Sequence, residues 1–419
     1  MNSIRKTYQW IGRVPSMLYE PELPGDKAKI CIILMHAESN YFEFHPALAL
    51  SERGYRVLVA NNSDPTKPLD HGIEDLAAAV KWAKEYPGVE KLVLLGHSGG
   101  ATLVSAYESI AENGLQIFQG PEKIIAISDV GWCVAADAVM FLDSNLGNGC
   151  MSLLSLDPAI IDERNGQLRD PELDMFLPAN GFDPEGCHYS ESFIRKFLEA
   201  QSDRMERLIR HCQERVDRID RGKGYFADDE PLALPGASQI GPNNKMFPQL
   251  PETFSHTAEA WNVIHPDGSM SRQIVPCLRK FRPGINSGSQ LNFGGLVTTV
   301  KGFLRSSAVH SDRDLLGYDE SFIYGVDWDS SYCVTTGNVA GIHVPMLIMG
   351  MTGSYEYIAA EHIYRRAVRC TDKTMAFVEG ASHNFVPQKN IEAYPGEFGD
   401  TVKNCFDYAD RWLTAKFQL

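Results

Sequence analysis

Apolar and polar residues alternate along the first third of the chain in blocks that predict strands and helices in turn. Three mostly apolar runs are typical of strands buried on both faces: residues 30–35, 56–60 and 91–95. A stretch with helical spacing of apolar residues follows each run: residues 44–53, residues 70–85 and the positions from Leu103 to Ile110. This order predicts an α/β protein with a mostly parallel, doubly wound sheet, preceded by one or two antiparallel strands in residues 1–28.

The alternation ends after a further predicted strand at residues 123–129. Residues 131–341 are irregular and rich in proline, glycine, asparagine and aromatic residues, and they contain one long predicted helix at residues 191–221. We therefore predict a core made of residues 1–130 and 342–419, with residues 131–341 inserted as a large, mainly helical cap or lid domain. The regular pattern resumes in the second core segment, in strands and helices at residues 344–350, 358–369, 374–379 and 399–416.

The run at residues 91–95 leads directly into the motif G-H-S-G-G, which is centred on Ser98. A strand, a sharp G-x-S-x-G turn and a helix form a nucleophile elbow, with the serine at the carboxyl end of a sheet strand. The strained backbone and the close passage of strand and helix leave no room for side chains at Gly96 and Gly100. The N–H of Gly99, at the start of the helix, is placed to donate to a developing oxyanion.

Composition and charge exclude several classes of function. The net charge of −15 argues against nucleic acids and anionic membrane surfaces as partners. The chain begins without an apolar signal sequence and has no run of about 18 apolar residues, so we expect neither secretion nor a membrane span. Nine cysteines, an odd number without C-x-x-C spacing, favour reduced thiols in the cytoplasm. Because H-E-x-x-H, P-loop and dinucleotide-binding motifs are missing, we expect no metal ion and no cofactor.

His383 lies directly after the last predicted strand and before the last predicted helix, in a G-x-x-H-x-F pattern. Together with the elbow around Ser98 and the turn that contains His36, this arrangement resembles the α/β-hydrolase superfamily. The resemblance covers roughly residues 28–130 and 342–419, and it implies a serine hydrolase with a large inserted cap. It also implies Ser98 as the nucleophile and His383 as its general base.

Two residues are candidates for the acidic member of the triad. The family usually places an aspartate in a G-x-x-D pattern after the penultimate strand, but that slot here holds Gly353. Glu356, three residues later, can reach the same imidazole nitrogen and is our first choice. Asp129, at the end of the predicted strand before the insertion, is the alternative, because some relatives supply the acid from there.

The second oxyanion donor is expected from the turn after the first buried strand. The family usually has His-Gly in this turn, whereas this chain has His36-Ala37-Glu38. The donor is then the backbone N–H of Ala37 or of Glu38, beside that of Gly99. We expect His36 itself to brace the loop rather than to act in catalysis.

Aromatic residues are frequent in the predicted cap, and we expect some of them to face Ser98 in a mostly apolar pocket. Trp132 follows the predicted sixth strand closely, so we expect it to bind substrate at the mouth of this pocket. These features favour hydrolysis of a carboxylic ester or lactone of a medium-sized, partly apolar molecule through an acyl-enzyme.

Two other functions are compatible with the same fold. One is cleavage of a carbon–carbon bond, or a lyase-like reaction, on the same residues. The other is a non-catalytic binder of small molecules, which would not need both Ser98 and His383. In each case the expected partner is a small-molecule substrate or ligand, and a homodimer is compatible with the sequence.

Overall fold

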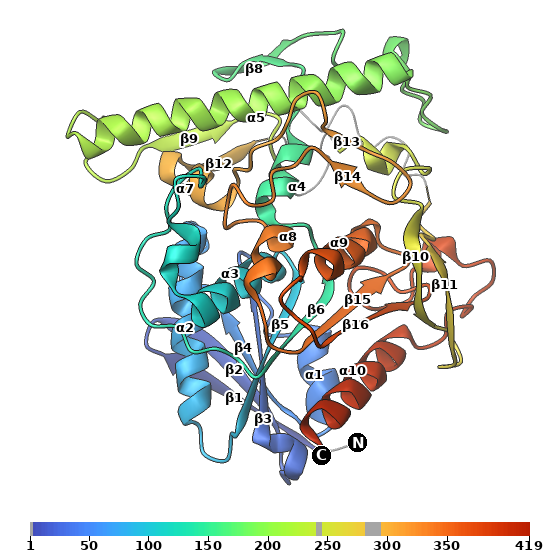
Figure 1. Cartoon of the computed structure of the whole chain (residues 1–419). Coiled ribbons are helices and arrows are strands. Elements are labelled where there is room, and N and C mark those ends of the chain that lie inside the picture. The colour runs from blue at the N-terminus through green and yellow to red at the C-terminus, as the bar shows by residue number, and fades with distance from the viewer. Residues whose placement is uncertain (1–2, 240–244, 281–294) are drawn as a thin grey trace.

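Ten strands form one sheet that runs through the molecule (Figure 1). The computed structural model describes residues 3–239, 245–280 and 295–419. The strand order is β1-β2-β4-β3-β5-β6-β15-β16-β10-β11; β2 is antiparallel to β1 and β4, β11 is antiparallel to β10, and the other neighbours are parallel. The strands are β1 (Ile4–Ile11), β2 (Val14–Pro21), β3 (Ile30–His36), β4 (Arg56–Asn61), β5 (Lys91–Ser98), β6 (Ala138–Ser144), β10 (His256–Ile264), β11 (Met270–Pro276), β15 (Met346–Met351) and β16 (Lys373–Val378).

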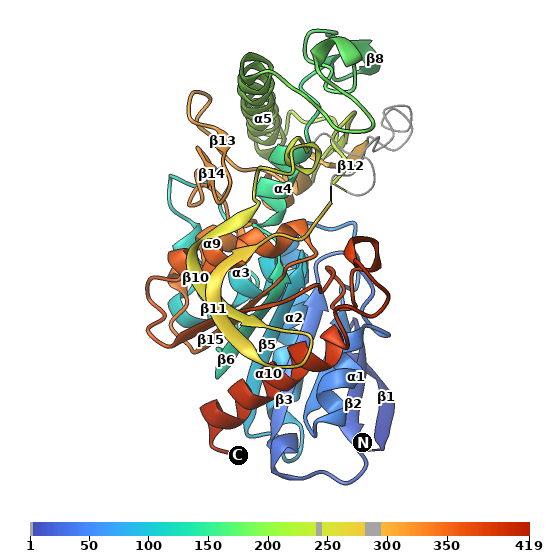
Figure 2. The same cartoon turned by 90° about the vertical axis from the view of Figure 1, so that its right-hand side faces the viewer.

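Helices cover both faces of this sheet, as the alternation of strands and helices predicts (Figure 2). Successive strand residues point to opposite faces, so Ile32 belongs to one apolar core and Ile33 to the other. The first core includes α1 and α10, and the second includes α2, α3 and α9. The bounds of these helices are α1 (His45–Glu52), α2 (Leu69–Glu85), α3 (Gly100–Asn113), α9 (Ile358–Arg366) and α10 (Thr401–Phe417).

Across the sheet, the order of the eight strands from β1 to β16 is that of the α/β-hydrolase fold, and so is the turn between β5 and α3. The predicted fold class is therefore confirmed for the core. In this fold the carboxyl ends of the parallel strands meet at one edge of the sheet, and the loops at that edge carry the chemistry. The turn after β5 and the loops after β3, β6, β15 and β16 all lie at this edge.

The segment between β6 and β15 extends beyond that edge, and α5 (Glu191–Asp220) crosses the far end of the molecule (Figure 1). Short strands and long irregular stretches make up much of the segment, so the expectation of a mainly helical insertion is wrong. Its frequent proline and glycine residues interrupt helical geometry. The other helices are α4 (Asn148–Ser155), α7 (Val300–Ser306) and α8 (Thr335–Asn338), and the small strands are β7 (Ile160–Asp162), β8 (Asn165–Arg169), β9 (Pro231–Leu234), β12 (Leu296–Thr299), β13 (Gly317–Tyr318) and β14 (Ile323–Tyr324).

The sixth strand of the sheet lies later in the chain than predicted. Residues 123–129 form no strand, and β6 begins at Ala138. The apolar residues of the predicted strand, Ile124 and Ile127, are buried from a loop instead, and that loop is held by hydrogen bonds such as Ile124 N–H to Ser330 O at 2.8 Å. A short apolar run indicates burial but does not by itself indicate a strand. For this reason the run at residues 123–129 was predicted as the sixth strand, although residues 138–144 form it.

The range predicted as an insertion thus contains parts of the central sheet. β6 lies within residues 131–341, and so does the hairpin of β10 and β11, which pairs with β16 through residues such as Val263 and Phe377. None of the helices in the described part of the chain is long and apolar enough to cross a lipid bilayer.

Candidate active site

The turn between β5 and α3 has the geometry of a nucleophile elbow. Ser98 has a φ of +52°, a strained conformation for a residue with a side chain. A Cβ at Gly96 would lie 2.7 Å from Cα of Ala101, and a Cβ at Gly100 would lie 2.6 Å from the carbonyl oxygen of Met35. Both glycines are therefore required by close contacts, as the sequence predicts, and the serine stands at the carboxyl end of β5.

His383 lies in the loop between β16 and α10, and Asp143 at the end of β6 contacts its ring. His383 Nδ1 and Asp143 Oδ2 are 2.7 Å apart, and the Asp143 side chain is fully buried. The other carboxylate oxygen, Oδ1, accepts the N–H of Met351 at 2.9 Å. A carboxylate held in this way keeps the proton of the imidazole on Nδ1, so that Nε2 can accept a proton.

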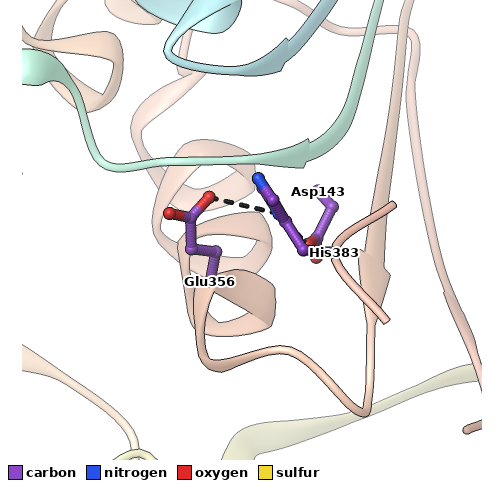
Figure 3. Close-up of side chains that lie close together, drawn as sticks. All are labelled: Asp143, Glu356 and His383. Carbon is purple, nitrogen blue, oxygen red and sulfur yellow. Dashed lines mark hydrogen bonds and ion pairs between the residues drawn. The ribbon is translucent and has the colours of Figure 1, made fainter. Parts of the chain in front are cut away.

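Glu356, the predicted acid, also lies beside His383. It follows β15 in a short 3₁₀ turn, and its Oε2 is 3.5 Å from His383 Nδ1 (Figure 3). Glu356 Oε2 is buried and makes no hydrogen bond with the described residues. Two carboxylates therefore flank one imidazole nitrogen, and Asp143 is the one at hydrogen-bonding distance.

The two carboxylates raise the pKa of His383. Burial by itself lowers this pKa, but the charges of Glu356 and Asp143 and the hydrogen bond to Asp143 outweigh it and raise the pKa to about 9. Burial also raises the pKa of Glu356, against the opposing charges of His383 and of the buried Lys245. Glu356 thus acts on His383 through its charge, without the orienting hydrogen bond that Asp143 makes.

Asp129, the alternative acid, lies away from this cluster. It is an exposed loop residue, and its Oδ1 accepts the N–H of Gly131 in its own turn. Residues 123–129 form no strand, and the carboxylate at the end of the sixth strand is Asp143 instead. The signal that identifies Asp143 is the apolar run at residues 138–142, which ends directly at this aspartate.

His97, next to the nucleophile, is engaged at both ring nitrogens. Its Nδ1 lies 2.8 Å from Tyr41 Oη, and its Nε2 lies 2.8 Å from the carbonyl oxygen of His383. The rings of His97 and His383 are 4.5 Å apart between centroids, so His97 ties the histidine loop to the elbow. Burial lowers the pKa of His97 well below its usual value, and a neutral bracing role follows.

His36, the last residue of β3, is held in one tautomer beside the elbow. Its Nδ1 accepts the N–H of Glu38 at 3.0 Å and that of Ser39 at 2.9 Å. Burial, with a smaller effect from His383, lowers the pKa of His36 to about 4, so the ring is neutral near pH 7 and its proton is on Nε2. A Cβ at Gly99 would lie 3.1 Å from this Nε2, so an N–H donor that sequence reasoning missed lies beside the elbow.

The same contacts separate the two predicted oxyanion donors. The N–H of Glu38 is directed at His36 Nδ1 and is therefore not free to bind an oxyanion. The turn is further held by the carbonyl oxygen of Ala37, which accepts from Asn62 Nδ2 at 2.9 Å. This geometry favours Ala37 over Glu38 as the donor from the turn.

Cavities lie on two sides of these residues. One of about 260 Å³ is bounded by His383, and another of about 290 Å³ is bounded by Ala37 and Glu38. Both linings mix polar and apolar groups, whereas a smaller third cavity bounded by Glu356, Phe247 and Phe254 is mostly apolar. Trp132 bounds neither cavity: it precedes β6, and 84% of it is exposed.

One ligand atom from each of Asp143, Glu356 and His383 lies within 4.8 Å of the other two, so a metal ion could be held by this cluster. Imidazole and carboxylate groups are common ligands of transition metals. A metal ion on His383 Nδ1 would have to displace the 2.7 Å contact with Asp143. The cluster therefore fits proton transfer better than metal binding.

A second serine–histidine–glutamate contact lies at the edge of the sheet. His265 Nε2 is 2.7 Å from Ser271 Oγ, and His265 Nδ1 is 2.7 Å from Glu379 Oε2. Ser271 lies within β11 rather than on a strained turn before a helix, so no helix N-terminus follows it to bind an oxyanion. The same residue types outside an elbow provide an internal comparison for Ser98.

No family model matches the chain, and no curated protein matches it in sequence. Solved structures with a similar arrangement include Est1E from Butyrivibrio proteoclasticus (11% identity, 99% of each chain covered, TM-score 0.41). A highly thermostable carboxyl esterase from Bacillus coagulans has 10% identity, with 99% of each chain covered and a TM-score of 0.42. Carboxyl esterase 2 from Tuber melanosporum has 10% identity, with 98% of this chain and 87% of that chain covered and a TM-score of 0.41. Values this low say nothing about the substrate of this chain.

The roles of the two carboxylates can be separated by amide substitutions. For Asp143→Asn we expect a fall in kcat of roughly 10⁴-fold, because the wrong tautomer of His383 becomes favoured. For Glu356→Gln we expect a much smaller loss, because the hydrogen bond from His383 to Asp143 remains. Steady-state kinetics of both variants on one ester measure this difference.

The pH profile gives a second readout. His383 must be neutral to accept a proton, so kcat/KM should increase as the pH rises through its elevated pKa. Glu356→Gln removes a negative charge that raises this pKa, and the increase should move to lower pH. A loss in Glu356→Gln larger than that in Asp143→Asn would instead assign the acid to Glu356.

Proposed function

We propose that this protein is a serine hydrolase that cleaves carboxylic esters through an acyl-enzyme on Ser98. The proposal is carried by two observations together: the strained serine at the elbow, and His383 in contact with the buried Asp143 at 2.7 Å. A buried carboxylate and a positive φ at a serine are both costly, and their occurrence together supports a catalytic site.

In the proposed reaction Ser98 Oγ attacks the ester carbonyl carbon while His383 Nε2 takes the hydroxyl proton. The tetrahedral intermediate collapses, the carbon–oxygen bond to the alcohol breaks, and His383 returns the proton to the leaving oxygen. Water then attacks the acyl-enzyme, with His383 again taking and returning a proton, and the carboxylic acid leaves. Asp143 stays ionised throughout and stabilises the imidazolium. We expect the hydrogen bond between Ser98 Oγ and His383 Nε2 to form when substrate binds.

Three N–H groups are proposed to stabilise the oxyanion. Two are the backbone groups of Gly99 and Ala37, and the third is the Nε2–H of His36. The tautomer of His36 supports this role, because two backbone N–H groups occupy its Nδ1. Donors fixed before the reaction stabilise the developing charge without reorganisation.

The same steps would open a lactone, so lactones belong to the proposed substrate range. The volumes of both cavities and their mixed polar and apolar linings support a medium-sized, partly apolar substrate. No contact in the described residues favours cleavage of a carbon–carbon bond over that of an ester, and a β-diketone substrate tests that alternative directly.

Replacement of the nucleophile tests the proposal. For Ser98→Ala we expect a loss of kcat of at least roughly 10⁴-fold, because the acyl-enzyme cannot form. A fluorophosphonate probe should label the wild-type protein on Ser98, as located by mass spectrometry of the labelled peptide. Activity should also survive dialysis against a metal chelator.

The matched control is Ser271→Ala, which removes a serine with similar histidine and glutamate contacts but no elbow. This variant should keep its activity and its labelling. Labelling of Ser271, or ester turnover in Ser98→Ala, would contradict the proposed mechanism. Turnover of the β-diketone without turnover of any ester would favour the carbon–carbon alternative.

The role of His36 is tested by His36→Asn. Asparagine keeps a side-chain acceptor for the turn but has no donor that reaches as far as Nε2. Removal of one oxyanion donor should lower kcat by roughly 10²- to 10³-fold with little change in KM. An unchanged Tm would separate this loss from unfolding, and an unchanged kcat would limit His36 to bracing the loop.

A further inference from the structure

Among the described residues, the cavity beside His383 is lined by cationic and neutral residues, and none of them is acidic. Its volume is about 260 Å³, and its lining includes Arg279, Lys280, Ser354 and Asn384 as well as His383. The chain as a whole is strongly acidic, with 54 acidic and 39 basic residues. The cavity next to His383 is therefore positively charged in a protein whose net charge is negative.

Arg279 is held rigidly at the wall of this cavity. The two residues before it are tied to the sheet region by Cys277 N–H to Ser255 O and by Leu278 N–H to Thr352 O, each at 2.7 Å. Its Nη2 donates to backbone carbonyl oxygens of a neighbouring loop, those of Phe247 at 3.2 Å, Leu250 at 3.3 Å and Thr253. The guanidinium group is thus fixed in place before any ligand binds.

The positive charge of this wall has no counterion among the described residues. Neither Arg279 nor Lys280 forms an ion pair there, whereas most ion pairs of the chain join arginine or lysine to a carboxylate. Arg279 Nη1 is buried and lacks a hydrogen-bond partner in the same residues. A charged group that is partly buried without an opposite charge is costly, and an anionic ligand in the cavity would supply that charge.

We propose that this cavity binds a carboxylate carried by the substrate, so that the preferred substrates are esters with a free acidic group. This inference rests on the proposed ester hydrolysis. Arg279 and Lys280 would bind the carboxylate, and the amide of Asn384 would donate a further hydrogen bond. The bound group would place the ester bond between His383 and Ser98.

The second cavity differs from the first in the charges of its lining. It lies on the side of Ala37 and contains both an acidic and a basic residue, Glu38 and Lys67. Charges of both signs give no preference for an anion there. The neutral part of the substrate is therefore assigned to the second cavity, and the carboxylate to the first.

Matched pairs of esters test the proposal. One pair carries the charge on the acyl side, as the p-nitrophenyl monoester of glutaric acid and its methylated neutral form. The other carries it on the alcohol side, as 4-acetoxybenzoate and its methyl ester. We expect kcat/KM to favour the anionic member of at least one pair by about tenfold or more, because a charge-assisted hydrogen bond is gained. The preference should weaken as salt screens the interaction.

Two variants test whether Arg279 and Lys280 cause the preference for the anionic ester. Lys280→Met should reduce the ratio of the anionic to the neutral rate, and Arg279→Gln should reduce it further. Arg272→Met, which removes an exposed cation on the nearby β11, is the control and should leave the ratio unchanged. Because each value is a ratio between two substrates, partial unfolding of a variant affects both rates and cancels.

The outcomes distinguish this inference from the proposed function. Equal rates within both pairs, or a preference that survives both variants, would overturn the carboxylate site while ester hydrolysis stands. The absence of turnover with all four esters, together with no labelling of Ser98, would overturn the proposed function itself. A preference limited to one pair identifies the side of the ester that carries the charge.

Discussion

The close approach of α3 to β3 and β5 is the constraint on which the site depends. The backbone of Gly100 lies so near Met35 that even a Cβ would fall 2.6 Å from its carbonyl oxygen. This contact fixes the distance between the elbow and the turn after β3, which carries His36 and Ala37. The proposed nucleophile and the proposed oxyanion donors are therefore held close together by packing in the core.

The histidine shows how geometry and charge divide one task between two side chains. Asp143 contacts Nδ1 at 2.7 Å and is itself held by the N–H of Met351, so it sets the orientation of the ring. Glu356 lies at 3.5 Å and contributes mainly an electric field. The charge of Glu356 raises the pKa of His383 but does not set the orientation of its ring.

Much of the core could be predicted from the sequence, because buried parallel strands and their helices have strong periodic patterns. The elbow around Ser98 and the loop of His383 were placed correctly, since local motifs specify both. Asp143 was missed because the apolar run at residues 123–129 predicts the sixth strand. Pairing with β5 and β15, which is long-range, places that strand at Ala138–Ser144 instead. The tautomer of His36 and the cationic cavity depend on contacts between segments far apart in the chain, which no local pattern encodes.

The hairpin of β10 and β11 makes the inserted segment part of the sheet. β10 pairs with β16, and the N–H of Glu379 continues this pairing to Ile264 at 3.0 Å, four residues before His383. Excision of the insertion to obtain a smaller enzyme would leave β16 as a bare edge, with unpaired backbone groups that invite aggregation. Engineering of the scaffold would therefore have to retain the hairpin.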